Sequence, residues 1–123
     1  PMRFMSSDGF PIFVGRSNRQ NDRLTTRTAE KWDLWFHTQK IHGSHVILST
    51  SGEQPDAQSI AEAASLAAYF SQAQSSTKVP VDFTQVKFVK KPAAAKPGMV
   101  VYTNYQTVLA DPNEELVKHL LVK

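Results

Sequence analysis

The strongest constraint on the fold is the alanine-rich segment "SIAEAASLAAYFSQAQ", residues 59–74. Ser59 and Glu62 form the S-x-x-E pattern of a capping box, in which each side chain accepts a hydrogen bond from a backbone amide at the helix start. Apolar and small residues then recur at helical spacing, at Ile60, Ala63, Ala64, Ala67 and Phe70 or Ser71. A stripe made mainly of alanine lets a sheet approach closely, so we expect this helix to be structural and not a site.

Short apolar runs elsewhere predict strands. They pair most simply as hairpins, around Asp8-Gly9, around the polar turn 38–44 and around Asn104-Tyr105. The runs are Arg3–Met5, Ile12–Val14, Leu34–His37, His45–Ser49, Phe83–Val89, Met99–Asn104 and Gln106–Leu109. Because the strands do not alternate regularly with helices, the fold class is α+β. We expect a mainly antiparallel sheet of about six short strands, packed by the alanine-rich helix and by short helices.

Two short helices complete the prediction. Asn21 or Asp22 can cap one that runs through Ala29, since both side chains accept hydrogen bonds from free amides. The tail, residues 111–123, predicts another, with Pro112 near its first turn. Its apolar residues either pack on the core or form an exposed docking face: Leu116, Val117 and Leu120.

Length and composition indicate one globular domain of residues 1–123. The chain has 41% hydrophobic and 20% charged residues and no cysteine, which excludes disulfides and thiolate metal sites and favours a reducing, cytoplasmic setting. No apolar run approaches the ~20 residues that span a bilayer, so we expect no membrane partner. The start at Pro1 suggests a fragment of a larger protein.

Positive charge is concentrated in two parts of the chain. Residues 1–50 carry seven basic and four acidic side chains, and residues 76–110 carry five and one. Residues 51–75 carry three acidic side chains and no basic one. The two basic segments can gather on one face, although an evenly mixed surface has the same composition.

Three histidines in "DLWFHTQKIHGSHVIL" (Asp33–Leu48) suggest a metal or catalytic site. The H-x4-H-x2-H spacing of His37, His42 and His45 matches no common zinc pattern, and no carboxylate completes it. Ser44 adjoins His45, but neighbouring strand residues face opposite sides of a sheet, which disfavours a Ser-His nucleophile. We therefore expect no cofactor and no enzyme, and at least one structural histidine.

Nucleic-acid binding accounts for more of the residues. The segment "GRSNRQNDR" (Gly15–Arg23) contains three arginines, two asparagines and a glutamine beside a helix start, where phosphate oxygens are favoured. A second basic group comprises Lys87, Lys90, Lys91 and Lys96. Aromatic rings near the turn can stack on unpaired bases: Trp35, Phe36, His37 and His42. Alternatively Trp35 or Phe36 belongs to the core, and Asn21 or Asp22 serves only as a cap.

Three segments in order resemble the NFACT-R domain, the C-terminal RNA-binding domain of the fibronectin-binding protein A-like factors of bacterial ribosome quality control (the RqcH factors). They are "IFVGRSNRQNDRLTTRTA" (Ile12–Ala29), "DLWFHTQKIHGSHVIL" and the stretch from Glu62 to Val108 that contains "VPVDFTQVKFVKKPAAAKPGMVVYTN". Two positions depart from the family pattern: His42 replaces a usual proline, and Trp32 replaces a common acidic residue. The departure at His42 further weakens a three-histidine metal site.

The resemblance implies an RNA-contacting module at the C-terminal end of a larger factor. Such factors bind stalled large ribosomal subunits and tRNA and support alanine tailing of nascent chains, so the implied partners are those particles and the parent protein's other domains. We expect the RNA backbone to contact Arg16, Asn18, Arg19, Gln20 and Asn21. Trp35 would stack, His37, Ser44 and His45 would line an adjoining pocket, and the four lysines would flank it. Alternatives are a fibronectin-binding adhesin, a protein scaffold acting through the tail, and a His-dependent metallohydrolase.

Overall fold

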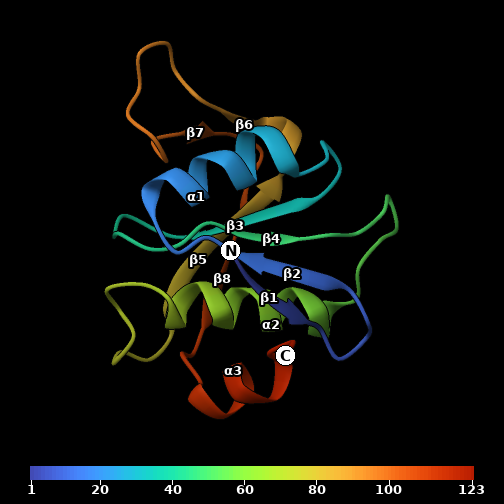
Figure 1. Ribbon diagram of the computed structural model, residues 1–123. Helices are drawn as coiled ribbons and strands as arrows, with labels where there is room; N and C mark the ends of the chain where they lie inside the picture. The colour runs from blue at the N-terminus through green and yellow to red at the C-terminus, as the bar shows by residue number, and fades with distance from the viewer.

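A six-stranded antiparallel sheet, sandwiched between two unequal layers, forms the centre of the computed structural model, which describes residues 1–123 (Figure 1). The strand order is β1-β2-β4-β3-β5-β8. The strands are β1 (Met2–Met5), β2 (Pro11–Val14), β3 (Leu34–Thr38), β4 (Val46–Leu48), β5 (Val79–Gln85) and β8 (Gln106–Ala110). The α+β class and the mainly antiparallel sheet are therefore confirmed, as are the β1–β2 and β3–β4 pairings.

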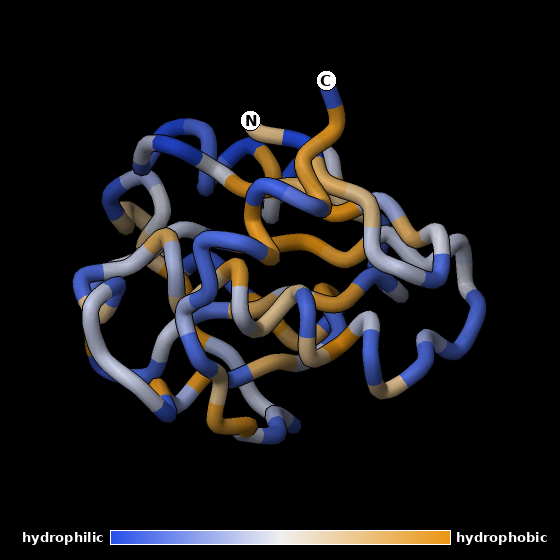
Figure 2. Tube along the Cα trace, turned by 90° about the horizontal axis from the view of Figure 1, so that it is seen from below, coloured by the Kyte–Doolittle hydropathy of each residue, from blue (hydrophilic) through white to orange (hydrophobic).

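One face of the sheet packs on α2 (Ala57–Tyr69), and α3 (Glu114–Leu120) in turn packs on α2. Four alanines of α2, Ala63, Ala64, Ala67 and Ala68, are fully buried there and allow the close approach predicted from their size. The C-terminal segment then returns to β1, where the Val122 amide donates to the Arg3 carbonyl. Figure 2 accordingly shows the two chain ends on the same side of the molecule.

The opposite face is covered by a smaller upper layer. It consists of α1 (Asn18–Arg23), the π-helical turn η1 (Leu24–Thr28), the 3-10 turn η2 (Val86–Phe88) and a separate two-stranded sheet of β6 (Val89–Lys90) and β7 (Val101–Tyr102). Trp35 and Phe36 are both buried, on opposite faces of β3. Phe36 belongs to the large core beneath α2, and Trp35 belongs to a small core with Leu24, Ile47 and Val86.

Both predicted N-terminal caps are wrong. Helix α1 begins at Asn18, because the Ser17 hydroxyl accepts the Gln20 amide at 3.1 Å. Asp56 caps α2 by accepting the Ser59 amide at 3.1 Å. Glu62 does not complete a capping box; its carboxylate accepts the Ser7 amide of the β1–β2 turn at 2.8 Å.

The predicted hairpin around Asn104-Tyr105 is also wrong. Asn104 does adopt positive φ, at +55°, but β7 pairs with β6, whereas β8 pairs with β5. The Thr84 hydroxyl lies 3.0 Å from the Thr103 carbonyl and 3.2 Å from the Asn104 carbonyl, which fixes the crossing from the small sheet to the large one. The run 83–89 is likewise divided among β5, η2 and β6 instead of forming one strand.

Candidate nucleic-acid interface

A cleft of about 940 Å³ opens in the upper layer, between α1, the loop after β3 and residues 94–100. We call it the α1 cleft. A second depression of about 450 Å³, the Ser44 groove, adjoins it beside the start of α1 and the end of α2. The two are continuous, because both are lined by Asn18, Asn21, His42, Gly43 and Gln72.

His45 forms part of the wall of the α1 cleft and is only 2% exposed. Its Nε2 lies 3.1 Å from the Gly98 carbonyl, which can only accept, so Nε2 carries the proton. Nδ1 then accepts from the Thr25 hydroxyl at 2.7 Å. Burial, reinforced by the neighbouring His37, lowers the pKa of His45 from 6.5 to about 4. The neutral imidazole therefore links η1 to the segment before β7 through one hydrogen bond at each ring nitrogen.

His37 projects from β3 into the same cleft. Its Nδ1 lies 2.7 Å from the Thr38 carbonyl, so Nδ1 donates and Nε2 of the neutral ring is an acceptor. The ring stacks on Trp35 with a centroid distance of 5.7 Å and an interplanar angle of 4°. Burial lowers the pKa of His37, although the carbonyls of Thr38 and Gly43 act in the opposite direction. The cleft is thus lined by two uncharged imidazoles.

The outer wall of the α1 cleft is the end of the β6–β7 connection, and Asp22 fastens it to α1. The Asp22 carboxylate accepts from Lys91 Nζ at 2.9 Å and from the Gly98 amide at 3.1 Å. These two contacts lower the pKa of Asp22. Gly98 has φ +83°, and a Cβ there would lie 3.3 Å from the Asn18 carbonyl. We call these contacts, together with the His45–Gly98 bond, the Asp22 latch.

Neither the α1 cleft nor the Ser44 groove is lined by any carboxylate. Their charged side chains are all cationic: Arg16 in the groove, and Lys40 and Lys96 in the cleft. The nearby Asp82 is 1% exposed and accepts from the Tyr102 hydroxyl at 2.6 Å. Burial and this bond raise the pKa of Tyr102. The combined surface thus favours anionic or neutral polar ligands.

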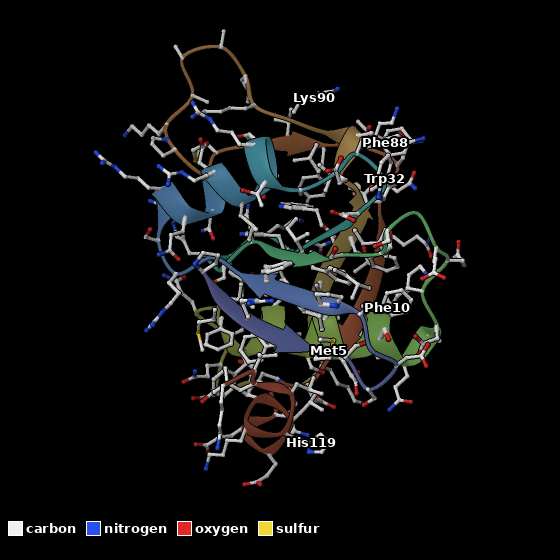
Figure 3. The ribbon with its side chains drawn as sticks, turned by 45° about the vertical axis from the view of Figure 1, so that its right-hand side comes forward. Met5, Phe10, Trp32, Phe88, Lys90 and His119 are labelled. Carbon is white, nitrogen blue, oxygen red and sulfur yellow. The ribbon has the colours of Figure 1, made fainter.

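The structure brings eight of the thirteen predicted site residues to these two depressions: Arg16, Asn18, Asn21, Trp35, His37, Ser44, His45 and Lys96. The other five, Arg19, Gln20, Lys87, Lys90 and Lys91, line neither. Lys91 is bound to Asp22. Figure 3 shows Lys90 in the upper layer, whereas His119 lies at the opposite end on α3. The four lysines therefore do not form one flanking group.

Burial or local hydrogen bonding corrects the roles expected of three of these residues. Trp35 is 1% exposed and its ring packs against Tyr102 at a centroid distance of 4.6 Å, so it supports the cleft and offers no open face to a base. Asn21 accepts the His45 amide at 3.0 Å through its buried side chain. The Gln20 side chain is used locally, because its Oε1 accepts the Arg16 amide at 2.9 Å.

The residues of the α1 cleft that sequence reasoning missed include Lys40, Gln72, Met99 and Tyr102. Lys40 lies in a polar turn at φ +60°, where no motif singled it out. Gln72 follows the end of α2, and only the tertiary fold carries it to the cleft. Its backbone amide donates a hydrogen bond to the His42 carbonyl at 3.0 Å. Tyr102 lies within the "YTN" portion of the family pattern, which was the one available signal.

The family model of the NFACT protein RNA binding domain matches residues 1–104. The chain belongs to this family. The protein called Rqc2 homolog RqcH from Bacillus subtilis (strain 168) is 50% identical over 114 residues, which are 93% of this chain and 20% of that protein. The Streptococcus suis protein of the same name (strain 05ZYH33) is 42% identical over 123 residues, 99% of this chain and 22% of that protein.

A solved structure has the same fold. The C-terminal part of the fibronectin/fibrinogen-binding protein from Streptococcus suis superposes with a TM-score of 0.95 at 41% identity. The match covers 99% of this chain and 49% of that one. Among the curated relatives, this chain spans about a fifth of the length of each protein that it matches.

Two further findings concern function. No group of three or more His, Asp or Glu side chains is arranged to hold a metal ion. None of the helices combines the length and the apolar character that a membrane span requires.

Proposed function

We propose that this NFACT domain binds RNA through the continuous surface of α1, the Ser44 groove and the α1 cleft. The observation that carries the proposal is that no carboxylate lines the Ser44 groove or the α1 cleft, whereas Arg16, Lys40 and Lys96 do. Such a surface attracts phosphate without repelling it at any lining position. The description of the matching family as an RNA binding domain supports the same conclusion.

The geometry suggests a division of roles within this surface. Arg16 and Arg19 are exposed around the start of α1, where their guanidinium groups can pair with phosphate oxygens. Neutral His37 and the cleft amides can form hydrogen bonds with bases or 2′-hydroxyl groups. Exposed His42 offers a further ring at the junction of cleft and groove.

The proposal extends to the parent protein. We infer that the domain is a non-catalytic module of a cytoplasmic quality-control factor that binds large ribosomal subunits and tRNA during alanine tailing. The support is the relationship to the RqcH proteins. The domain would contribute RNA contacts, and its position in the factor would depend on the other domains.

Binding of the domain to tRNA and to large ribosomal subunits, titrated from low to physiological salt, tests the proposal. We expect affinity to fall as salt rises, because bound phosphates release counterions. The double variant Arg16→Ala/Arg19→Ala should bind more weakly. Its salt dependence should also be shallower, by about one unit of slope for each phosphate that the variant no longer neutralises.

The matched control is Lys118→Ala/Lys123→Ala, which removes the same charge from exposed positions at the opposite end. If both double variants lose equal affinity, binding reflects net charge alone and the assigned surface is wrong. Binding that is absent or insensitive to salt would favour a protein scaffold, with α3 as the next surface to test.

A second candidate, fibronectin binding, rests on the name of the Streptococcus suis protein whose C-terminal part shares this fold. Immobilised fibronectin and the same two double variants test it. Saturable binding that survives physiological salt, while RNA binding is absent, would favour this candidate.

A further inference from the structure

We propose that the α1 cleft receives a single unpaired nucleotide of the bound RNA, with the base inside and the flanking phosphates at Lys40 and Lys96. This inference rests on the proposed RNA binding and deepens it. It identifies the RNA as one with an unstacked position, such as a loop, bulge or single strand, and excludes a regular duplex as the preferred ligand.

The size and lining of the cleft carry the first part of the argument. Its volume of about 940 Å³ lies within the range of ~300–1,000 Å³ in which proteins bind small ligands. Aromatic walls from His37 and Tyr102 adjoin the amides of Asn18 and Gln72. Rings and amides together suit a nucleobase, which has a π-face and a hydrogen-bonding edge.

The distribution of charge around the cleft also favours an unpaired nucleotide. A base is neutral while its phosphates are anionic, and the cleft offers uncharged imidazoles with lysines at its edge. The bases of an RNA duplex are paired and stacked, so their Watson–Crick edges cannot enter a cleft. A duplex would contact only the cationic rim.

The Asp22 latch supplies a distinctive feature. It fixes the 94–98 segment, whose short Ala94, Ala95 and Pro97 side chains leave the space open. A wall that is ordered before binding costs less conformational entropy when the ligand enters. Asp22 itself does not line the cleft, so it acts on binding only by positioning that wall.

Asp22→Ala provides a test, because the loss of a negative charge and the loss of the ordered wall should change RNA affinity in opposite directions. Replacing Asp22 with Ala removes a negative charge close to the RNA surface, which by electrostatics alone strengthens RNA binding. Opening the latch instead weakens insertion of an unpaired base. Glu30→Ala is the matched control, because Glu30 is exposed, lines neither depression, and carries the same charge.

The probes are a short single-stranded RNA carrying one 2-aminopurine and the duplex of the same sequence. We expect the wild-type domain to quench 2-aminopurine in the single strand and to bind that strand more tightly than the duplex. Asp22→Ala should lose about tenfold in single-strand affinity, which corresponds to ~1.4 kcal/mol, and should keep or gain affinity for the duplex. Glu30→Ala should match or exceed the wild type with both probes.

Several results would overturn the inference. They are equal affinity of the wild type for the two probes, no quenching, or a gain in single-strand affinity in Asp22→Ala. Any of these results would refute nucleotide insertion but would leave the proposed salt-dependent RNA binding through Arg16 and Arg19 intact. Absence of binding to either probe would refute the proposed function itself.

A second pair of variants keeps the test decisive if Asp22→Ala fails to fold. Lys91→Gln removes the same ion pair from the other side, and Lys87→Gln removes an equal charge from a position outside both depressions. Lys91→Gln should lose more single-strand affinity than Lys87→Gln, while the two should lose duplex affinity equally. Equal losses with both probes would also overturn the inference.

Discussion

Acidification should destabilise this domain mainly through His45. The pKa of His45 is about 4 in the folded chain, against ~6.5 in an unfolded chain. Between these two values the unfolded state binds more protons than the folded state, so stability falls as pH falls. The contribution of His45 is fully present above about pH 6.5 and is lost progressively down to about pH 4.

The magnitude follows from the two pKa values. At pH 4.5 the unfolded histidine is almost fully protonated, whereas the folded one is mostly neutral, and the linkage relation gives a loss of about 2–3 kcal/mol relative to pH 7. His45 is 2% exposed, so solvent screening reduces this figure little. A loss of that size is large against a typical stability of ~5–15 kcal/mol.

Urea unfolding at pH 7 and pH 4.5 measures the effect. The wild type should lose about 2–3 kcal/mol more than His45→Gln across this interval, because Gln has no proton to gain. NMR titration of the imidazole resonances should show one histidine with a midpoint near pH 4. An identical pH dependence in both proteins, or a His45 midpoint near 6.5, would refute the reasoning.

Three further variants test the packing that positions the cleft. Gly15→Ala should lower the free energy of unfolding by about 1–3 kcal/mol, because the new Cβ would lie 3.0 Å from the Asn21 backbone nitrogen; thermal denaturation measures this. Thr25→Val should cost about 1–3 kcal/mol in urea unfolding by leaving His45 Nδ1 unpaired, and Thr25→Ser should recover most of the loss. Asp56→Ala should destabilise the domain by removing the α2 cap, seen as a lower melting temperature in circular dichroism.

The sequence was sufficient for the elements and their pairing where periodicity was strong. The alanine stripe predicted the buried face of α2, and the apolar runs around Asp8-Gly9 predicted the β1–β2 hairpin. Both signals are local, since a helix face or a tight turn depends on residues close in the chain.

Pairings between distant segments were not predictable in the same way. Nothing local indicates that β7 pairs with the preceding strand β6, or that β8 pairs with the more distant β5. The decisive contacts are long-range, such as the Tyr102 hydroxyl on Asp82. The two caps failed for a related reason, because several polar residues lay near each helix start and only the folded backbone selected Ser17 and Asp56.

For the candidate site, the structure brings many of the predicted residues around α1 and the histidines to the same two depressions. Burial separates those that face the cleft from those that support it. Trp35 and His45 are among the least exposed residues of the chain. Sequence alone could not show this, because both faces of β3 are covered by other elements. The strand therefore lacks the alternation of apolar and polar residues that would mark an exposed face.

The placement of negative charge offers a last argument about the site. Asp22 is close enough to hold Gly98 at the rim, where an unpaired carboxylate would oppose phosphate binding. Lys91 neutralises it at 2.9 Å, and His45 makes the second rim contact without any charge. The wall is therefore held by a neutralised ion pair and a neutral imidazole, which leaves Arg16, Lys40 and Lys96 to set the potential that an RNA strand meets.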